Sequence, residues 1–201
     1  MSAKHLSALL GLLTLAGCTS LVATATGPEP LGRPAGERTL SMKIEDESIE
    51  HTASVNIYKA DAQFHDANVN VVSFYGNVLL AGQVQSDALK ARAEEVVRQI
   101  AEVKQIHNEL TVEDASYLLQ HLKDDFVSTR IRSSLALEKG FPSSRTKVLT
   151  VNGTVYLLGK LTSDEADQAV NIIKQVAGVQ RIVKLVDYLP AATAATAPAG
   201  A

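Results

Sequence analysis

The stretch TVNGTVYLLG, residues 150–159, has the pattern of a β-hairpin. Its Asn-Gly pair stands between two apolar runs, and a type I′ turn requires positive φ at both central residues, which Asn and Gly tolerate best. A second stretch, SFYGNVLLAG at residues 73–82, repeats the pattern. We therefore predict two related hairpins, each with a pair of glycines at the same spacing, and these four glycines are predicted to be structural turn positions: Gly76, Gly82, Gly153 and Gly159.

The repeat extends to both sides of the hairpins. Apolar residues at helical spacing precede each hairpin, and they are Ile49, Ala53 and Ile57 in the first copy and Val127, Ile131 and Leu135 in the second. A second helical stripe follows, with Leu89, Ala93, Val96, Val97 and Ile100 matched by Ala166, Ala169, Val170, Ile173 and Val176. Thr162 and Glu165 form a capping box at the start of the later stripe. A final strand is predicted at residues 104–112 and again at residues 179–189.

Each unit therefore reads helix, strand, strand, helix, strand. Such a unit is a small α+β domain rather than one repeat of a solenoid. We predict an α+β protein of two tandem domains, at residues 44–113 and 116–189.

The N-terminus has the layout of a secretory signal. Lys4 and His5 precede an apolar stretch that leads into LAGC at residues 15–18. The apolar stretch is about half the ~20 residues that a membrane-spanning helix needs. We predict a signal peptide over residues 1–17. The only cysteine, Cys18, follows it directly, and an incidental cysteine behind a plain signal peptide is the alternative interpretation.

The segments on either side of the two units differ from them in composition. Residues 18–43 and 190–201 are rich in Thr, Ala, Gly and Pro, and we predict a flexible spacer and a disordered tail. The net charge of −3 and the absence of Trp give no support to nucleic-acid binding, which depends on basic surfaces and aromatic stacking.

Several motifs together carry a resemblance to a known family. LAGC resembles the bacterial lipobox, and the GNVLLAG and GTVYLLG hairpins with their VKQI and VQRI strand starts resemble BON domains. The whole chain resembles the dual BON-domain outer-membrane lipoproteins. This resemblance implies cleavage before Cys18, acylation of Cys18 with fatty acids such as palmitate, and, because Thr19 rather than Asp follows, export to the outer membrane.

The same resemblance implies a fold and a function. Two helices would pack on one face of each three-stranded sheet, and the protein would have no enzymatic activity and no cofactor. It would lie on the periplasmic face of the outer membrane, bind anionic phospholipid of the inner leaflet, and support envelope integrity.

The first helices of the two units differ on the face that the core does not use. In the second copy this face carries large apolar side chains beside cations, a composition suited to a membrane interface, and its predicted lipid-binding residues are Lys123, Phe126, Thr129, Arg130, Ser133 and Leu137. In the first copy the same face carries Ser48, Thr52, Val55 and Lys59 beside four acids, Glu45, Asp46, Glu47 and Glu50. We predict that the second domain is the lipid-binding one.

Two alternatives stay open from the residues alone. Phe126 and Leu137 could instead pack on the other domain, because a domain of this size has a marginal core by itself. The chain could also be a protein-binding adaptor for outer-membrane assembly or cell-wall remodelling machinery, with the lipid anchor only a tether.

The sequence contains no recognisable catalytic or metal-binding constellation. His51, His65, His107 and His121 lack ligand spacing. The pair Asp124-Asp125 is interpreted as a helix cap rather than as an acid pair. No G-x-S-x-G elbow and no phosphate loop is present.

Overall fold

The computed structural model describes residues 36–113 and 118–190. The predicted signal peptide, Cys18 and residues 191–201 of the predicted tail lie outside the described residues. Among the helices of the described part, none is long and apolar enough to cross a membrane.

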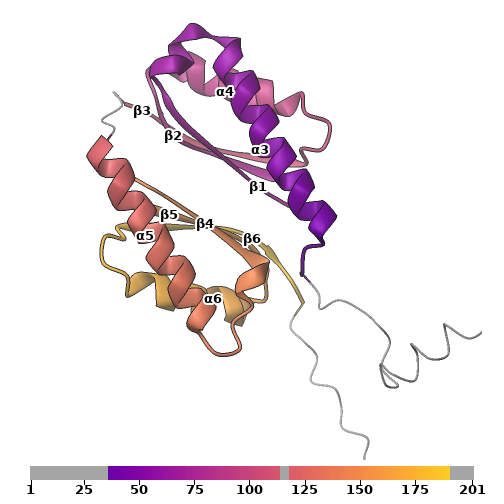
Figure 1. The fold of residues 1–201 in the computed structure, drawn as a ribbon, viewed down its shortest axis with the longest axis vertical. Helices are drawn as coiled ribbons and strands as arrows, with labels where there is room; N and C mark the ends of the chain where they lie inside the picture. Colours follow the sequence, from indigo (N-terminus) through magenta and orange to yellow (C-terminus); the bar gives the residue numbers. More distant parts are fainter. Residues whose placement is uncertain (1–35, 114–117, 191–201) are drawn as a thin grey trace, which may run out of the picture. The chain divides into compact units, whose positions relative to one another are not determined.

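Two copies of one helix-strand-strand-helix-strand unit, each with a short 3-10 turn before its first strand, make up the described chain (Figure 1). The first copy consists of α3 (Leu40–Ala60), the 3-10 turn η1 (Ala62–Asp66), β1 (Asn68–Phe74), β2 (Asn77–Val84), α4 (Asp87–Arg98) and β3 (Gln105–Val112). The second consists of α5 (Leu118–Leu137), η2 (Ser143–Arg145), β4 (Thr146–Val151), β5 (Thr154–Leu161), α6 (Ser163–Lys174) and β6 (Arg181–Tyr188). The predicted α+β fold class and element order are confirmed.

Both sheets have the same three-stranded topology. The strand orders are β1-β2-β3 and β4-β5-β6. The first two strands of each sheet pair antiparallel through a hairpin, and the third pairs parallel to the second. A parallel pair needs a crossover, and α4 and α6 supply it. Each sheet therefore has its third strand, β3 or β6, at an edge.

The first unit begins earlier than the sequence indicated. The Thr39 side chain caps α3 by accepting a hydrogen bond from the Met42 amide at 3.0 Å. Arg38 already forms an ion pair with Asp46 at 3.0 Å. The predicted spacer over residues 18–43 therefore ends too late, because residues 38–43 belong to the folded unit.

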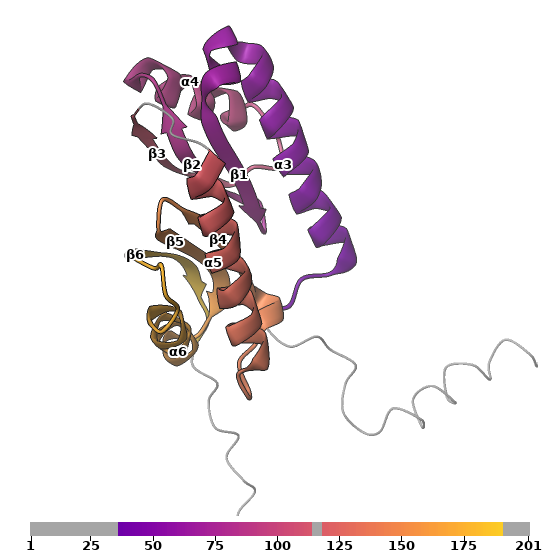
Figure 2. The same cartoon turned by 60° about the vertical axis from the view of Figure 1, so that its left-hand side comes forward.

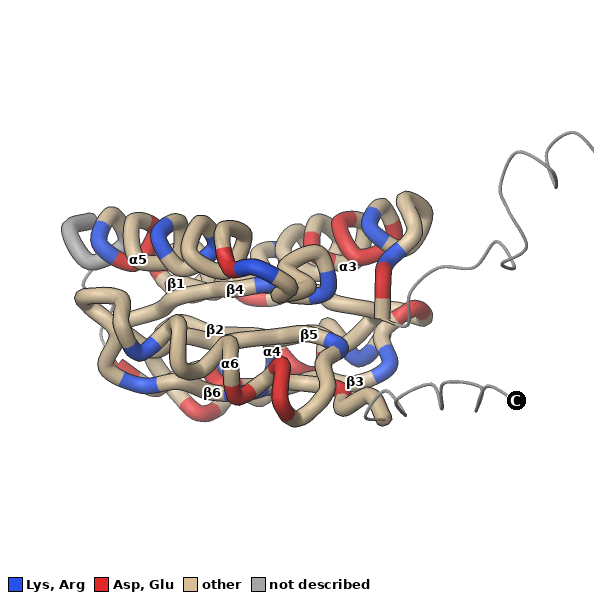
Figure 3. Tube along the Cα trace, turned by 90° about the horizontal axis from the view of Figure 1, so that it is seen from below, with Lys and Arg blue, Asp and Glu red and all other residues tan. Residues whose placement is uncertain are grey.

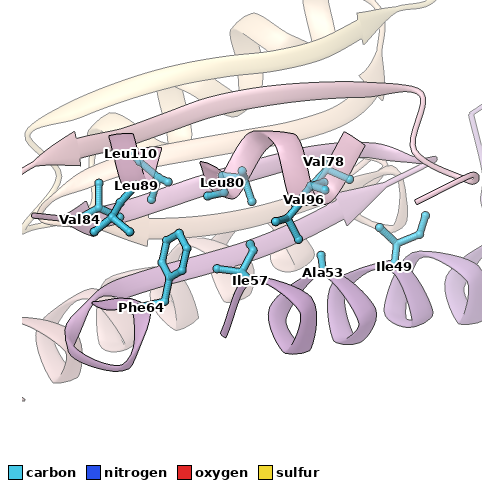
Figure 4. Packing of buried hydrophobic residues seen from close by; sticks show 12 residues of the cluster. Ile49, Ala53, Ile57, Phe64, Val78, Leu80, Val84, Leu89, Val96 and Leu110 are labelled. Atoms are coloured by element: carbon cyan, nitrogen blue, oxygen red, sulfur yellow. The ribbon is translucent and has the colours of Figure 1, made fainter. Parts of the chain in front are cut away.

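The helical stripes predicted from sequence form the cores. In the first unit, Figure 4 shows side chains of α3 meeting those of the sheet, and the cluster includes Ile49, Ala53, Ile57, Leu80, Leu89 and Val96. The second unit repeats the arrangement with Val127, Ile131, Leu135, Leu157, Ala169 and Ile173. Two helices thus pack on one face of each sheet (Figures 1 and 2). The capping box of Thr162 and Glu165 is also present.

The other face of each sheet contributes to a third cluster. This cluster joins residues of both units, namely Phe74, Leu79, Ala81, Val151, Tyr156 and Leu158. The apolar runs of β2 and β5 are buried on both faces for this reason, as is typical of central strands. Lys147 of the second unit also pairs with Glu50 of the first. Docking between the units therefore uses the sheets.

The two hairpin turns have the backbone that their sequences predict. Tyr75-Gly76 and Asn152-Gly153 all have positive φ, between 48° and 78°, as a type I′ turn requires. The prediction that Gly82 and Gly159 are turn positions is wrong. They lie inside β2 and β5, where a Cβ would come within 1.9 Å of the Asn68 carbonyl oxygen and 2.9 Å of the Arg145 carbonyl oxygen. Close backbone approach, not a turn, requires glycine there.

Candidate membrane-contact surface

The predicted lipid-binding residues all lie on the solvent side of α5. Lys123, Phe126, Thr129, Arg130, Ser133 and Leu137 are all exposed. We call these six residues, together with Leu122, the α5 face. Val127, Ile131 and Leu135 point from the same helix into the core, so the fold holds the helix without using the α5 face.

The exposed apolar side chains of the α5 face are large. Leu122, Phe126 and Leu137 are 65%, 62% and 83% exposed. Neither Phe126 nor Leu137 is buried against the first unit, so the structure contradicts the alternative in which they pack between the domains. Leu122 was missed in the sequence analysis, although it precedes Phe126 by one helical turn and shares its stripe.

Cations accompany these apolar side chains. The Arg130 guanidinium lies 5.6 Å from the centre of the Phe126 ring, within the range of a cation–π contact. Within the described residues Arg130 forms no ion pair, so its five N–H donors are available to a ligand. Lys123 lies about two helical turns before Arg130, towards the start of α5. Figure 3 shows Lys and Arg positions along this helix.

The corresponding face of α3 is different. Aligning Asp46 with Asp124 places Ser48 where Phe126 stands, Thr52 where Arg130 stands and Glu45 where Lys123 stands. Only Ile44, which is 57% exposed and matches Leu122, keeps a large apolar side chain. The corresponding face of α3 therefore lacks both the aromatic ring and the guanidinium.

The acids of α3 are not all on that face, which corrects one part of the sequence interpretation. Asp46 is 1% exposed and accepts hydrogen bonds from the amides of Tyr75 and Gly76 at 3.1 and 3.0 Å. Glu50 accepts the Ser73 amide and pairs with Lys147. Only Glu45 and Glu47 of the four remain as exposed acids.

Asp124 has the same role in the second unit. Its carboxylate accepts hydrogen bonds from the amides of Asn152 at 2.7 Å and Gly153 at 3.0 Å. The prediction that Asp124 caps a helix is wrong, because α5 begins at Leu118. A carboxylate from each long helix instead holds the turn of the hairpin beneath it.

The pKa of Asp46 reflects this arrangement. Burial alone would raise it, but the hydrogen bonds from the Gly76 amide, the Ser73 hydroxyl and the Tyr75 amide, together with Arg38, outweigh burial and place the pKa below its usual value. A carboxylate so engaged is a structural ion and not a general acid.

No metal centre is formed by the described residues. Nowhere in residues 36–113 and 118–190 do three or more potential His, Cys, Asp or Glu ligands gather. His65 stacks on Tyr58 with ring centres 4.0 Å apart, and the side chain of His121 lies outside the described residues.

Comparison with known proteins agrees with the duplicated architecture. A model of the BON domain matches residues 54–114 and 123–190. The chain is 32% identical to outer membrane lipoprotein DolP of Haemophilus influenzae, over 92% of this chain and 96% of that protein. It is also 32% identical to a 21 kDa hemolysin of Actinobacillus pleuropneumoniae, over 78% and 81% of the two chains.

A more distant relative is the osmotically-inducible protein Y of Escherichia coli, at 26% identity over 85% of this chain and 89% of that protein. The BON domain matches contain both hairpins, the helices α4 and α6 and the strands β3 and β6, and they begin within α3 and α5. The chain belongs to the BON domain family and carries two BON domains in tandem.

Proposed function

We propose that this protein is a lipoprotein anchored to the periplasmic face of the outer membrane, which binds anionic phospholipid through the α5 face of its second BON domain and so supports envelope integrity. The similarity to an outer membrane lipoprotein over nearly the whole chain supports the location. The observation that carries the proposal is the exposure of Leu122, Phe126 and Leu137 beside Arg130 and Lys123.

The chemistry of the α5 face suits an anionic interface. Burying a Leu or Phe side chain contributes roughly 1.5–3 kcal/mol relative to leaving it in water. Arg130 presents a planar donor fork that matches phosphate oxygens in pairs. The α5 face offers binding and no reacting group, so the proposed function is not enzymatic.

Because the proposed anchor at Cys18 already attaches the chain to the membrane, weak lipid binding by the α5 face is sufficient to position the second domain. Two or more acyl chains hold a protein stably at a membrane, whereas one chain binds reversibly. A tethered domain meets the surface at a high effective concentration. Lipid binding by α5 would then set where on the membrane the domain resides and how it is oriented, rather than whether it is attached.

Vesicle co-sedimentation tests the proposal. The chain without residues 1–18 should pellet with vesicles that contain anionic phospholipid and should stay in solution with zwitterionic vesicles alone. Binding should weaken as salt is added, because exposed charges are screened over about 8 Å at physiological ionic strength. Equal binding to both kinds of vesicle, or to neither, would contradict the proposal.

A further inference from the structure

A groove on the second domain lies well apart in sequence from the α5 face. It runs between α6 and the edge strand β6 and has a volume of about 360 Å³. It is lined by three cations, Lys174, Arg181 and Lys184, by three apolar residues, Val170, Val179 and Ile182, and by Gln180. Its charged lining residues are all basic, and its uncharged lining residues are apolar except for Gln180. This combination fits an acidic ligand that also has apolar parts.

In the first domain, a polar network occupies the corresponding position between α4 and β3. There the Asn108 side chain bridges the gap by donating to the Lys90 carbonyl at 2.9 Å and to the Glu94 carboxylate at 3.2 Å. Glu94 in turn pairs with Arg98. Strand β3 is thus tied to α4 by a polar network that is satisfied internally.

The second domain has lost this network position by position. The helices α4 and α6 have equal length, both end at a capping glutamine, and β3 and β6 start at the same distance beyond it. On this alignment Glu94 becomes Val170 and Asn108 becomes Lys184, while Arg98 becomes Lys174 and Gln105 becomes Arg181. An acid and two amides are replaced by an apolar residue and two cations.

The cations of the groove have few partners of their own. Lys184 lies 3.7 Å from Asp167 in a pair whose side chains are 40% and 68% exposed, and such exposed pairs contribute little. Lys174 forms no ion pair among the described residues. A cation in the last turn of a helix is common, as Arg98 shows, and Arg181 forms a side-chain hydrogen bond with Tyr156. Lys184 of β6 has no such explanation.

The backbone beside the groove is also open. Within the described residues, β6 pairs with β5 only, so its outer edge presents unpaired N–H and C=O groups. An edge of this kind can accept a further strand. A lysine such as Lys184 normally discourages pairing with apolar strands, but acidic side chains on the incoming strand would neutralise it.

We propose that the groove between α6 and β6 binds an acidic, extended polypeptide segment of a partner protein, which adds a strand to the edge of β6. The incoming main chain pairs with β6. Acidic side chains at alternate positions meet Lys174 and Lys184 on the helix side of the sheet, and their apolar atoms rest on Val170 and Ile182. This second binding activity goes beyond the lipid-binding function proposed for the α5 face.

The probe is a fluorescent peptide of alternating Glu and Val, blocked at both ends and titrated with the full-length chain in neutral detergent. Fluorescence anisotropy should show saturable binding, and a Lys-Val peptide should not bind. Lys174→Glu with Lys184→Glu should weaken binding at least tenfold. The double variant Lys43→Glu with Lys59→Glu makes the same change in net charge on the first domain and should leave peptide binding unchanged.

Strand pairing is tested separately from charge. Two versions of the peptide carry methyl groups either on all Glu nitrogens or on all Val nitrogens, and because one edge of the peptide faces β6, only one version should lose binding. Amide hydrogen exchange of the unmutated chain should slow along β6 when the parent peptide is bound. Equal binding by both methylated versions, or exchange unchanged along β6, would overturn the proposal.

Two further tests use inorganic phosphate and anionic vesicles. Displacement of the peptide by inorganic phosphate, but not by sodium chloride of equal ionic strength, would identify a small-anion site and overturn strand addition. Lys174→Glu with Lys184→Glu should retain binding to anionic vesicles, because the α5 face is unchanged, so this proposal and the proposed function fail independently. In the first domain, Glu94→Val with Asn108→Lys should create a second peptide site.

Discussion

Single carboxylates hold the two hairpins, and Asp46 shows how. It is buried and accepts the amides of Tyr75 and Gly76, the Ser73 hydroxyl and the Arg38 guanidinium. The residues that meet here are distant in sequence. Because these residues are far apart in the sequence, Asp46 resembled part of a charged surface, and its hydrogen-bond partners are identifiable only in the folded chain. The type I′ turns, by contrast, were predictable because their signal is local.

The charge of Asp46 should make stability depend on pH. Its pKa is lower in the folded chain than its usual value of about 3.9, so the unfolded chain takes up the proton first as the pH falls. The stabilisation is therefore complete above about pH 4 and is lost below it. Asp46→Asn should cost about 1–3 kcal/mol at neutral pH. Denaturant unfolding at several pH values should show this difference shrinking below about pH 4, and a constant difference would contradict the account.

Gly153 is needed for a different reason, namely its backbone conformation. Its φ is +69°, and a Cβ would approach the Gln180 side chain to 2.9 Å. Gly153→Val should destabilise the protein by about 1 kcal/mol or more, because a β-branched residue is strained at positive φ. A thermal melt compared with the unmutated chain measures this loss, and an unchanged melting temperature would refute the assigned role.

The helices illustrate what can be predicted at the scale of an element. Apolar spacing identified the buried stripe of every helix, because a core face repeats with the helical period. The same periodicity places Phe126, Arg130 and Leu137 on the face of α5 that points away from the core, and all three are exposed. What periodicity could not decide was whether another domain covers that face, because periodicity describes one helix and not its neighbours.

The α5 face can be removed without disturbing the core. Phe126→Ala with Arg130→Glu should abolish co-sedimentation with anionic vesicles, because both the apolar anchor and the phosphate contact are lost. Circular dichroism and melting temperature should stay nearly unchanged, since Val127, Ile131 and Leu135 still hold the helix. The matched changes Thr52→Ala and Val55→Ala in α3 should leave vesicle binding intact. A strong loss of stability in the α5 variant would instead indicate a structural role.

At the scale of the molecule, the two domains share a cluster built from the helix-free faces of their sheets. The apolar runs of β2 and β5 contained this information, because strands buried on both faces lack polar alternation. In the sequence these runs indicate only hairpin strands, and the alternative in which the domains dock placed that contact on Phe126 and Leu137 of α5. Docking through the sheets leaves both long helices with an exposed face, and only that of α5 combines an aromatic ring with a guanidinium.

The anchor is the other prediction that belongs to the whole molecule. Cys18 follows a small-residue cleavage site, and its acylation would attach the chain to the membrane. Cys18→Ala should leave an unprocessed or soluble periplasmic protein, measured by fractionation after high-salt and carbonate washes. Retention of the variant in the outer membrane after both washes would show that another feature anchors the chain.

The most direct test of lipid binding uses the absence of tryptophan from the chain. In Phe126→Trp the indole becomes a single fluorescent reporter on the α5 face, and in Ser48→Trp it reports on the matching position of α3. Anionic vesicles should shift the emission of the Trp at position 126 to shorter wavelength, because the ring leaves water for the headgroup region, and should leave that of the Trp at position 48 unchanged. Emission from position 126 that does not change with anionic vesicles would contradict the central claim that the second BON domain binds lipid through α5.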